Sequence, residues 1–134
     1  MFEILQHTAD VRARVEAASL EELFRDAMRA MYAVMRARNE PPQSAVRRHV
    51  IVEGSADTTS LLVDFLNEVL HRAHVAREQF TDATFTRFDA TSLEAELTGT
   101  APASFEEDVK AVTYHEADVR TSGERWATML VFDI

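Results

Sequence analysis

Two carboxylates are adjacent at the end of the sequence, where Asp133 is followed by Ile134 and its α-carboxylate. The apolar residues that precede them predict a strand, so both carboxylates are expected at one strand end. Carboxylate oxygens are the ligands that Ca²⁺, Mg²⁺ and Mn²⁺ prefer, and a cation relieves the repulsion between two carboxylates. The sequence therefore suggests a divalent-metal site here, with a solvated, frayed terminus as the alternative.

Lys110 is the only lysine in the chain, because the other 13 of the 14 basic residues are arginine. A two-residue hairpin loop at Ser122-Gly123 would place Asp133 opposite Val112, with Lys110 diagonal to Asp133 on the same face. Diagonal neighbours are about 7–8 Å apart, within reach of a long side chain. A register that differs by one residue would bring His115 to that face instead. The alternative is an ordinary surface ion pair, worth less than about 1 kcal/mol.

Two other kinds of site find little support in the sequence. Glu68 and His71 have the Glu-x-x-His spacing of bundle metal sites, but such sites need a second copy and further glutamates on other helices. A solvated helix face is the better interpretation of this pair. A nucleophilic enzyme is disfavoured because the chain lacks both cysteine and a Gly-x-Ser-x-Gly elbow.

Two helices can be predicted from capping residues and apolar spacing. Ser19 and Glu22 form a capping box, and the apolar residues after it predict a helix to about Arg36 that Pro41-Pro42 ends. Asp57 to Ser60 offer N-caps for a second helix, which is expected to end between residues 74 and 79.

The rest of the chain is predicted to be mainly extended. Strands are expected at residues 11–15, 46–53, 84–90, 93–99, 109–120 and 125–133. We therefore expect a single α+β domain over residues 1–134, with two layers and both helices packed on one face of a mixed or antiparallel sheet.

Composition narrows the function classes. The 134 residues carry a net charge of −9, which disfavours direct binding to a phosphate backbone. Three glycines are too few for a glycine-rich phosphate loop, and the absence of cysteine excludes disulfides. The N-terminus lacks the pattern of a secretion signal and no apolar run could span a bilayer, so a cytoplasmic protein without membrane contact is expected.

Six segments, spread in order over nearly the whole chain, carry a resemblance to one known family. They are His7-Thr8-Ala9-Asp10, Ser19-Leu20-Glu21-Glu22-Leu23-Phe24, Leu61-Leu62-Val63-Asp64-Phe65-Leu66-Asn67-Glu68, Phe85-Thr86-Arg87-Phe88, Val109-Lys110-Ala111-Val112-Thr113-Tyr114-His115 and Val131-Phe132-Asp133-Ile134. On these segments the sequence resembles the archease family, the small accessory proteins of the tRNA-splicing RNA ligase that joins RNA ends through a 3′-phosphate. The chain departs from the family at Gln6, at Ala17-Ala18 and in the short segment 99–108.

The resemblance implies a two-layer α+β fold and a non-enzymatic role. Archeases promote guanylylation of the ligase, in which a ligase histidine takes up GMP, and so allow multiple turnover. By the same resemblance, Asp10, Asp133 and Ile134 would hold a divalent metal, Ca²⁺ in the family with Mn²⁺ or Mg²⁺ as alternatives. Lys110 would be the functionally important lysine. The expected partner is the ligase, whose basic RNA-binding surface suits an acidic chain.

Two other functions are open at this level. One is a chaperone-like interaction module that needs no metal. The other is a small metal-dependent hydrolase that would use Asp10, His7 and His115. Ligation turnover with and without this protein, together with hydrolysis by the protein alone, separates the three functions.

Overall fold

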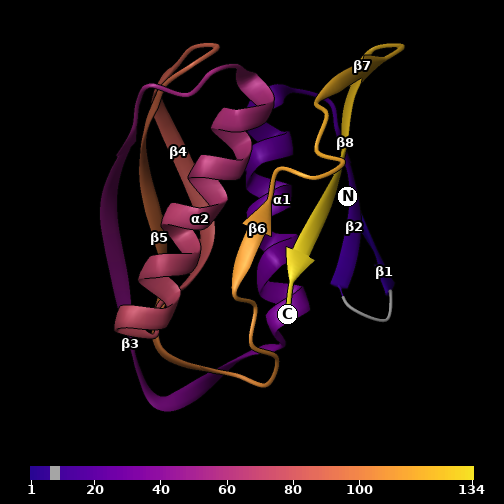
Figure 1. The fold of residues 1–134 in the computed structure, drawn as a ribbon. Helices are drawn as coiled ribbons and strands as arrows, with labels where there is room; N and C mark the ends of the chain where they lie inside the picture. The colour runs from indigo at the N-terminus through magenta and orange to yellow at the C-terminus, as the bar shows by residue number, and fades with distance from the viewer. Residues whose placement is uncertain (7–9) are drawn as a thin grey trace.

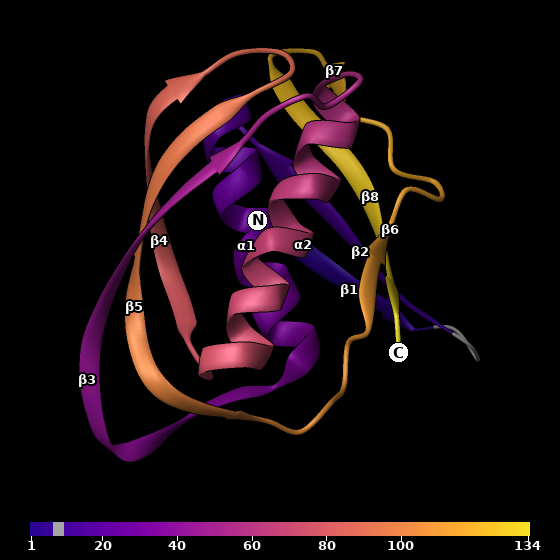
Figure 2. The same cartoon turned by 60° about the vertical axis from the view of Figure 1, so that its left-hand side comes forward.

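The computed structural model describes residues 1–6 and 10–134, which form two helices and eight strands in two antiparallel sheets. Helices α1 (Leu20–Met35) and α2 (Thr58–Ala76) lie between the sheets, as Figures 1 and 2 show from two directions. The α+β class and both helices agree with the sequence-based expectation. The strands differ in one respect, because they form two sheets, one on each side of the helices, where one sheet was expected.

Both helices begin at the residues that the sequence suggests. The Ser19 side chain accepts a hydrogen bond from the Glu22 N–H over 3.2 Å, and Asp57 accepts one from the Ser60 N–H over 2.8 Å. Their apolar faces meet in the core, where the rings of Phe24 and Phe65 lie 5.9 Å apart between centroids. The helices therefore provide the rigid layer to which both sheets attach.

The first sheet, called the terminal sheet, is built from both ends of the chain. It contains β1 (Phe2–Gln6), β2 (Asp10–Ala17), β8 (Arg125–Asp133) and β6 (Ala111–Thr113) in that order, and β7 (Arg120–Ser122) also pairs with β8. Strand β8 thus lies between the N-terminal strands and the β6–β7 segment. This order places an N-terminal strand, β2, directly beside the C-terminal strand β8.

The second sheet has the order β3–β5–β4, from β3 (Ala37–Val52), β5 (Leu93–Phe105) and β4 (Gln79–Phe88). The prediction that Pro41-Pro42 separates the first helix from a later strand is wrong, because β3 begins directly after Arg36 and includes both prolines. Arg36 turns the chain in the left-handed conformation, and the β3–β5 register shifts between Asn39 and Ser44. Proline has no backbone N–H to donate, and an edge strand tolerates it at such an irregularity because no donor is needed there for pairing.

The predicted strand over 109–120 is also wrong, because this segment leaves the sheet between β6 and β7. Side chains of α2 hold the departing chain: Thr59 accepts a hydrogen bond from the Val119 N–H over 2.9 Å, and Asp64 accepts one from the Tyr114 hydroxyl. Glu116 turns the chain with a φ of 61°. Tertiary contacts with a helix therefore override the extended pattern of the sequence.

The hairpin between β7 and β8 has a register different from the predicted one. Ser122 pairs with Arg125, so Gly123 and Glu124 form the two-residue loop, with Gly123 at a φ of 66°. Within the described residues, no helix is long and apolar enough to cross a membrane.

Candidate functional site

Asp10 and Asp133 are direct partners in the antiparallel pairing of β2 with β8. Asp10 is the first residue of β2, Asp133 is the last residue of β8, and Ala111 of β6 pairs with Asp133 on its other side. Opposite residues of an antiparallel pair project on the same face with Cβ atoms about 4.5–5.5 Å apart. The fold therefore brings together two carboxylates from opposite ends of the sequence.

Ile134 and Lys110 lie just beyond this row of the sheet. The Lys110 backbone N–H donates a hydrogen bond to the Asp133 carbonyl oxygen over 2.7 Å. The Ile134 side chain is half-buried against the core, whereas Lys110 is exposed. The lysine is thus adjacent to the carboxylates through its backbone.

The strand register that was predicted to place Lys110 near Asp133 is wrong. The prediction placed Val112 opposite Asp133, but Val112 pairs with Phe132 and is buried in the core. The β7–β8 register and the detour between β6 and β7 together shift the pairing, because the two segments are not one continuous strand.

Of the two histidines named as candidates, the structure describes only His115, which it does not place at this site. His115 is exposed in the turn that follows β6, outside the pairing of β6 with β8. His7 lies outside the described residues.

Arg12 is the cation nearest to these carboxylates among the contacts of the described residues. Its Nε atom lies 3.5 Å from Asp10 Oδ1, and its guanidinium also pairs with Glu116 in the β6–β7 connection. The side chains of Asp10 and Arg12 are 26% and 21% exposed, so solvent screens this pair only in part. Arg12 therefore offsets some of the negative charge at Asp10.

The donor set suits a hard divalent cation. Asp10 and Asp133 provide carboxylate oxygens from one face of the paired strands. No group of three or more His, Cys, Asp or Glu side chains in residues 1–6 and 10–134 is arranged to hold a metal. A cation here would consequently need main-chain, terminal or water oxygens to complete its coordination.

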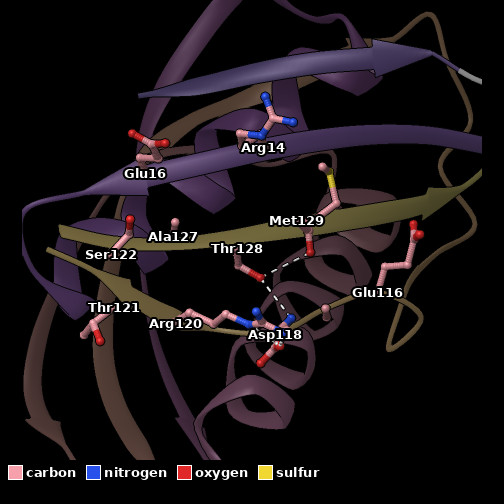
Figure 3. A pocket seen from close by; sticks show the side chains of 11 residues that line it. Arg14, Glu16, Glu116, Asp118, Arg120, Thr121, Ser122, Ala127, Thr128 and Met129 are labelled. Atoms are coloured by element: carbon pink, nitrogen blue, oxygen red, sulfur yellow. Dashed lines mark hydrogen bonds and ion pairs between the residues drawn. The ribbon is translucent and has the colours of Figure 1, made fainter.

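An open pocket of about 830 Å³ lies farther along the same face of the terminal sheet (Figure 3). Its lining has mixed charge, with Arg14 and Arg120 among acidic residues, and Arg120 pairs with Asp118. Thr128 accepts a hydrogen bond from the Asp118 N–H and donates one to the Met129 carbonyl, each over 3.2 Å. The lining does not include the predicted ligands, so this pocket is separate from the carboxylate site.

The Glu-x-x-His pair of α2 forms no metal site in the described part of the chain. Glu68 instead pairs with Arg72 over 3.1 Å, and His71 is exposed. The interpretation as a polar helix face agrees with these contacts.

Sequence reasoning missed the polar side chains of α2 that hold the β6 region. Asn67 exchanges two hydrogen bonds with the Val112 backbone, each over 2.9 Å, and Asp64 accepts one from Ser55 over 2.7 Å. A signal was present, because Asp64 and Asn67 interrupt the apolar run of α2 three residues apart. Such a pair on a mostly buried helix needs polar partners.

The comparisons with known proteins point to one family, and each covers nearly the whole chain. Residues 2–134 match the model of the Archease protein family (MTH1598/TM1083). Protein archease of Methanosarcina mazei is 31% identical over 146 residues, which cover 99% of this chain and 95% of the relative. Protein archease of Pyrococcus abyssi is 34% identical over 142 residues, covering 99% and 98%.

Two solved structures share the fold. The solution structure of Methanobacterium thermoautotrophicum protein 1598 has a TM-score of 0.69 and 25% identity, covering 99% of this chain and 98% of that one. The crystal structure of a Thermotoga maritima archease, described as a possible chaperone, has a TM-score of 0.69 and 17% identity, covering 98% and 96%. With a family model that matches nearly every residue and relatives above 30% identity, the chain belongs to the archease family.

Proposed function

We propose that this chain is a non-enzymatic activator of a tRNA-splicing RNA ligase, which promotes ligase guanylylation and multiple turnover. The proposal includes a divalent cation held by Asp10, Asp133 and the carboxylate of Ile134, with Ca²⁺ as the first candidate. The observation that carries it is the direct pairing of Asp10 with Asp133 across β2 and β8. Membership of the archease family supports an accessory role, and the ligase as the partner is the part of the proposal that the turnover assay tests.

The cation part of the proposal is supported by the charge of the site. Two carboxylates on one face repel each other, and Arg12 contacts only Asp10 of the two among the ion pairs of the described residues. When bound, a divalent cation would neutralise this repulsion and present positive charge at the end of the sheet. The role of the chain's own residues is to hold these oxygens at fixed spacing on paired strands.

The partner part is supported by charge and exposure. The chain carries a net charge of −9, which suits a partner with a basic surface. Asp133 and Lys110 are both exposed at the end of the terminal sheet, where another protein can reach them. The description of the Thermotoga maritima archease as a possible chaperone also suits a role that depends on a protein partner.

The test is multiple-turnover ligation by the ligase from the same source, with and without this protein. The wild-type chain should raise turnover, whereas Asp10→Asn and Asp133→Asn should each remove most of the increase. Glu124→Gln is the matched control, because it removes one exposed carboxylate at the β7–β8 turn, away from the site.

The same assay separates the other functions. Full activation by both aspartate variants would contradict a metal-dependent role and favour a chaperone-like module. Hydrolysis of nucleotide or RNA phosphate by the protein alone, lost in Asp10→Asn, would identify a hydrolase. Metal affinity of each variant, measured by titration with Ca²⁺ and Mn²⁺, links the turnover result to the proposed ligands.

A further inference from the structure

A single side chain of α2 satisfies the outer edge of β6. The Asn67 Nδ2 group donates a hydrogen bond to the Val112 carbonyl oxygen over 2.9 Å, and the Val112 N–H donates one to Asn67 Oδ1 over 2.9 Å. This exchange of two hydrogen bonds is the pattern that a neighbouring strand provides to a residue of an antiparallel pair. Asn67 thus takes the place of a strand on the side of β6 that faces α2.

The position of β6 determines what lies beside Asp133. Val112 is the middle residue of this three-residue strand, and Ala111 next to it pairs with Asp133. Lys110 directly precedes Ala111, and its backbone N–H donates a hydrogen bond to the Asp133 carbonyl oxygen over 2.7 Å. Any movement of Val112 away from α2 would therefore be transmitted to Lys110 within two residues.

On its opposite edge, β6 is held by the pairing of all three of its residues with β8. The Asp64 and Thr59 side chains bind the chain only after β6, at Tyr114 and at Val119. The half-buried Asn67 amide is the α2 group that bonds to the strand itself. Its loss would leave a buried residue, Val112, with two backbone groups that need new partners.

We propose that Asn67 is a positioning residue of the carboxylate site, which fixes β6 so that Lys110 lies against Asp133. This inference rests on the proposed function for its biological consequence, because it assigns Lys110 to ligase activation. Its structural part is independent of the ligase.

Three variants test the inference. Asn67→Leu removes both hydrogen bonds and keeps a side chain of similar size. Asn67→Asp keeps an acceptor for the Val112 N–H but at neutral pH places a carboxylate against the Val112 carbonyl. Thr59→Val is the matched control, because it removes a hydrogen bond between the same helix and the same connection, at Val119 and away from the site.

The first measurement is the hydrogen-exchange protection of the Lys110 amide, with the melting temperature as a check on global folding. Asn67→Leu should lower this protection about tenfold or more, the loss expected for one or two hydrogen bonds. Thr59→Val should leave it unchanged. In Asn67→Asp, the introduced carboxyl group can donate one hydrogen bond and accept one when it is protonated, as the amide does. Protection in this variant should therefore recover as the pH is lowered and be lost as it is raised, a profile absent from the wild type.

The second measurement is ligase turnover, which should fall in Asn67→Leu and stay at the wild-type level in Thr59→Val. Unchanged Lys110 protection in Asn67→Leu, or full activation despite lost protection, would overturn the inference. Failure of the wild-type protein to activate the ligase would instead contradict the proposed function, while the exchange measurements still decide whether Asn67 positions Lys110.

Discussion

The backbone N–H of Lys110 donates a hydrogen bond to the carbonyl oxygen of Asp133 over 2.7 Å, at the point where the pairing of β6 with β8 ends. The only lysine of the chain is consequently held next to a proposed metal ligand by main-chain atoms. Its side chain is exposed and remains available to a partner.

Replacement of Lys110 should affect activation far more than cation binding. Lys110→Ala removes a charge that could meet a phosphate or carboxylate of the ligase, so activation should fall about tenfold or more. Metal affinity should stay within about threefold, because the carboxylates and the backbone hydrogen bond are retained. Lys110→Arg keeps the charge but changes its shape and donor geometry. Full activation by both variants in the turnover assay would show that Lys110 is an ordinary surface cation.

Chemical change at the Ile134 carboxylate tests the third proposed ligand. An amide at this position, introduced by semisynthesis, should lower Ca²⁺ or Mn²⁺ affinity about tenfold or more, because a charged oxygen ligand is lost. In the presence of a chelator the amidated and free-acid proteins should melt together, whereas only the free acid should be strongly stabilised by metal.

The control for that experiment should lie at the same end of the chain. A one-glycine extension retains a free carboxylate but displaces it, so its affinity should also fall. An N-terminal tag is less suitable, because the Met1 amine pairs with Asp26. Equal metal stabilisation of all three C-terminal forms would remove the Ile134 carboxylate from the site.

Arg12 should weaken cation binding in the wild type. Its Nε atom lies 3.5 Å from Asp10 Oδ1, so it would repel a divalent cation at the proposed site. Arg12→Gln should raise Ca²⁺ affinity about 3- to 10-fold at low ionic strength, with a smaller increase in high salt. Arg14→Gln is the control, because Arg14 is the next outward residue of β2 and pairs with Glu3. A lower affinity in Arg12→Gln, or an equal rise in both variants, would contradict this account.

The two tyrosines should titrate above their ordinary range. The hydrogen bond to the Asp64 carboxylate, together with burial and the nearby charge, raises the pKa of Tyr114 above 10.0, and burial raises the pKa of Tyr32. Because the folded-state pKa of Tyr114 is raised, its contribution to stability is fully present below pH 10 and is lost as the pH rises through the folded-state pKa. Asp64→Asn should return the Tyr114 pKa toward 10.0 in a near-ultraviolet titration. A phenol that ionises at its ordinary pKa in the wild-type fold would show that this contact is not formed.

Gly99 should be essential to the β3–β5–β4 sheet. A Cβ atom there would clash with the backbone carbonyl oxygen of Gln79 and lie 2.7 Å from the Cα of Phe80. Because both are main-chain atoms, Gly99→Ala should lower the free energy of unfolding by about 2–4 kcal/mol. Thr98→Ala on the same strand should cost less, and equal denaturation midpoints for the two variants would contradict the predicted clash.

Local signals explain the parts of the fold that could be predicted. The Ser19 and Asp57 caps act within three residues, so sequence spacing is sufficient to locate both helices. The β3 strand was missed over its first half because prolines usually end an element, whereas this edge strand accommodates them at a register shift.

The candidate site depends on pairings that no local pattern encodes. The carboxylates of Asp133 and Ile134 could be noticed as neighbours, but the pairing of Asp133 with Asp10 depends on strand order in the terminal sheet. The position of Lys110 depends on Asn67 and on the path of the chain along α2. Counting residue pairs back from the hairpin loop assumes one continuous ladder and therefore cannot predict this path.

The strand order of the terminal sheet also has a kinetic consequence. Because β2 pairs with β8 across nearly the whole chain, their association closes a very long loop and must await much of the intervening structure. A ligand held between these strands stabilises contacts that form late, so it should slow unfolding more than it accelerates folding. A partly folded chain would thus lack the carboxylate pair altogether, and only molecules that have completed folding would be competent to act on a partner.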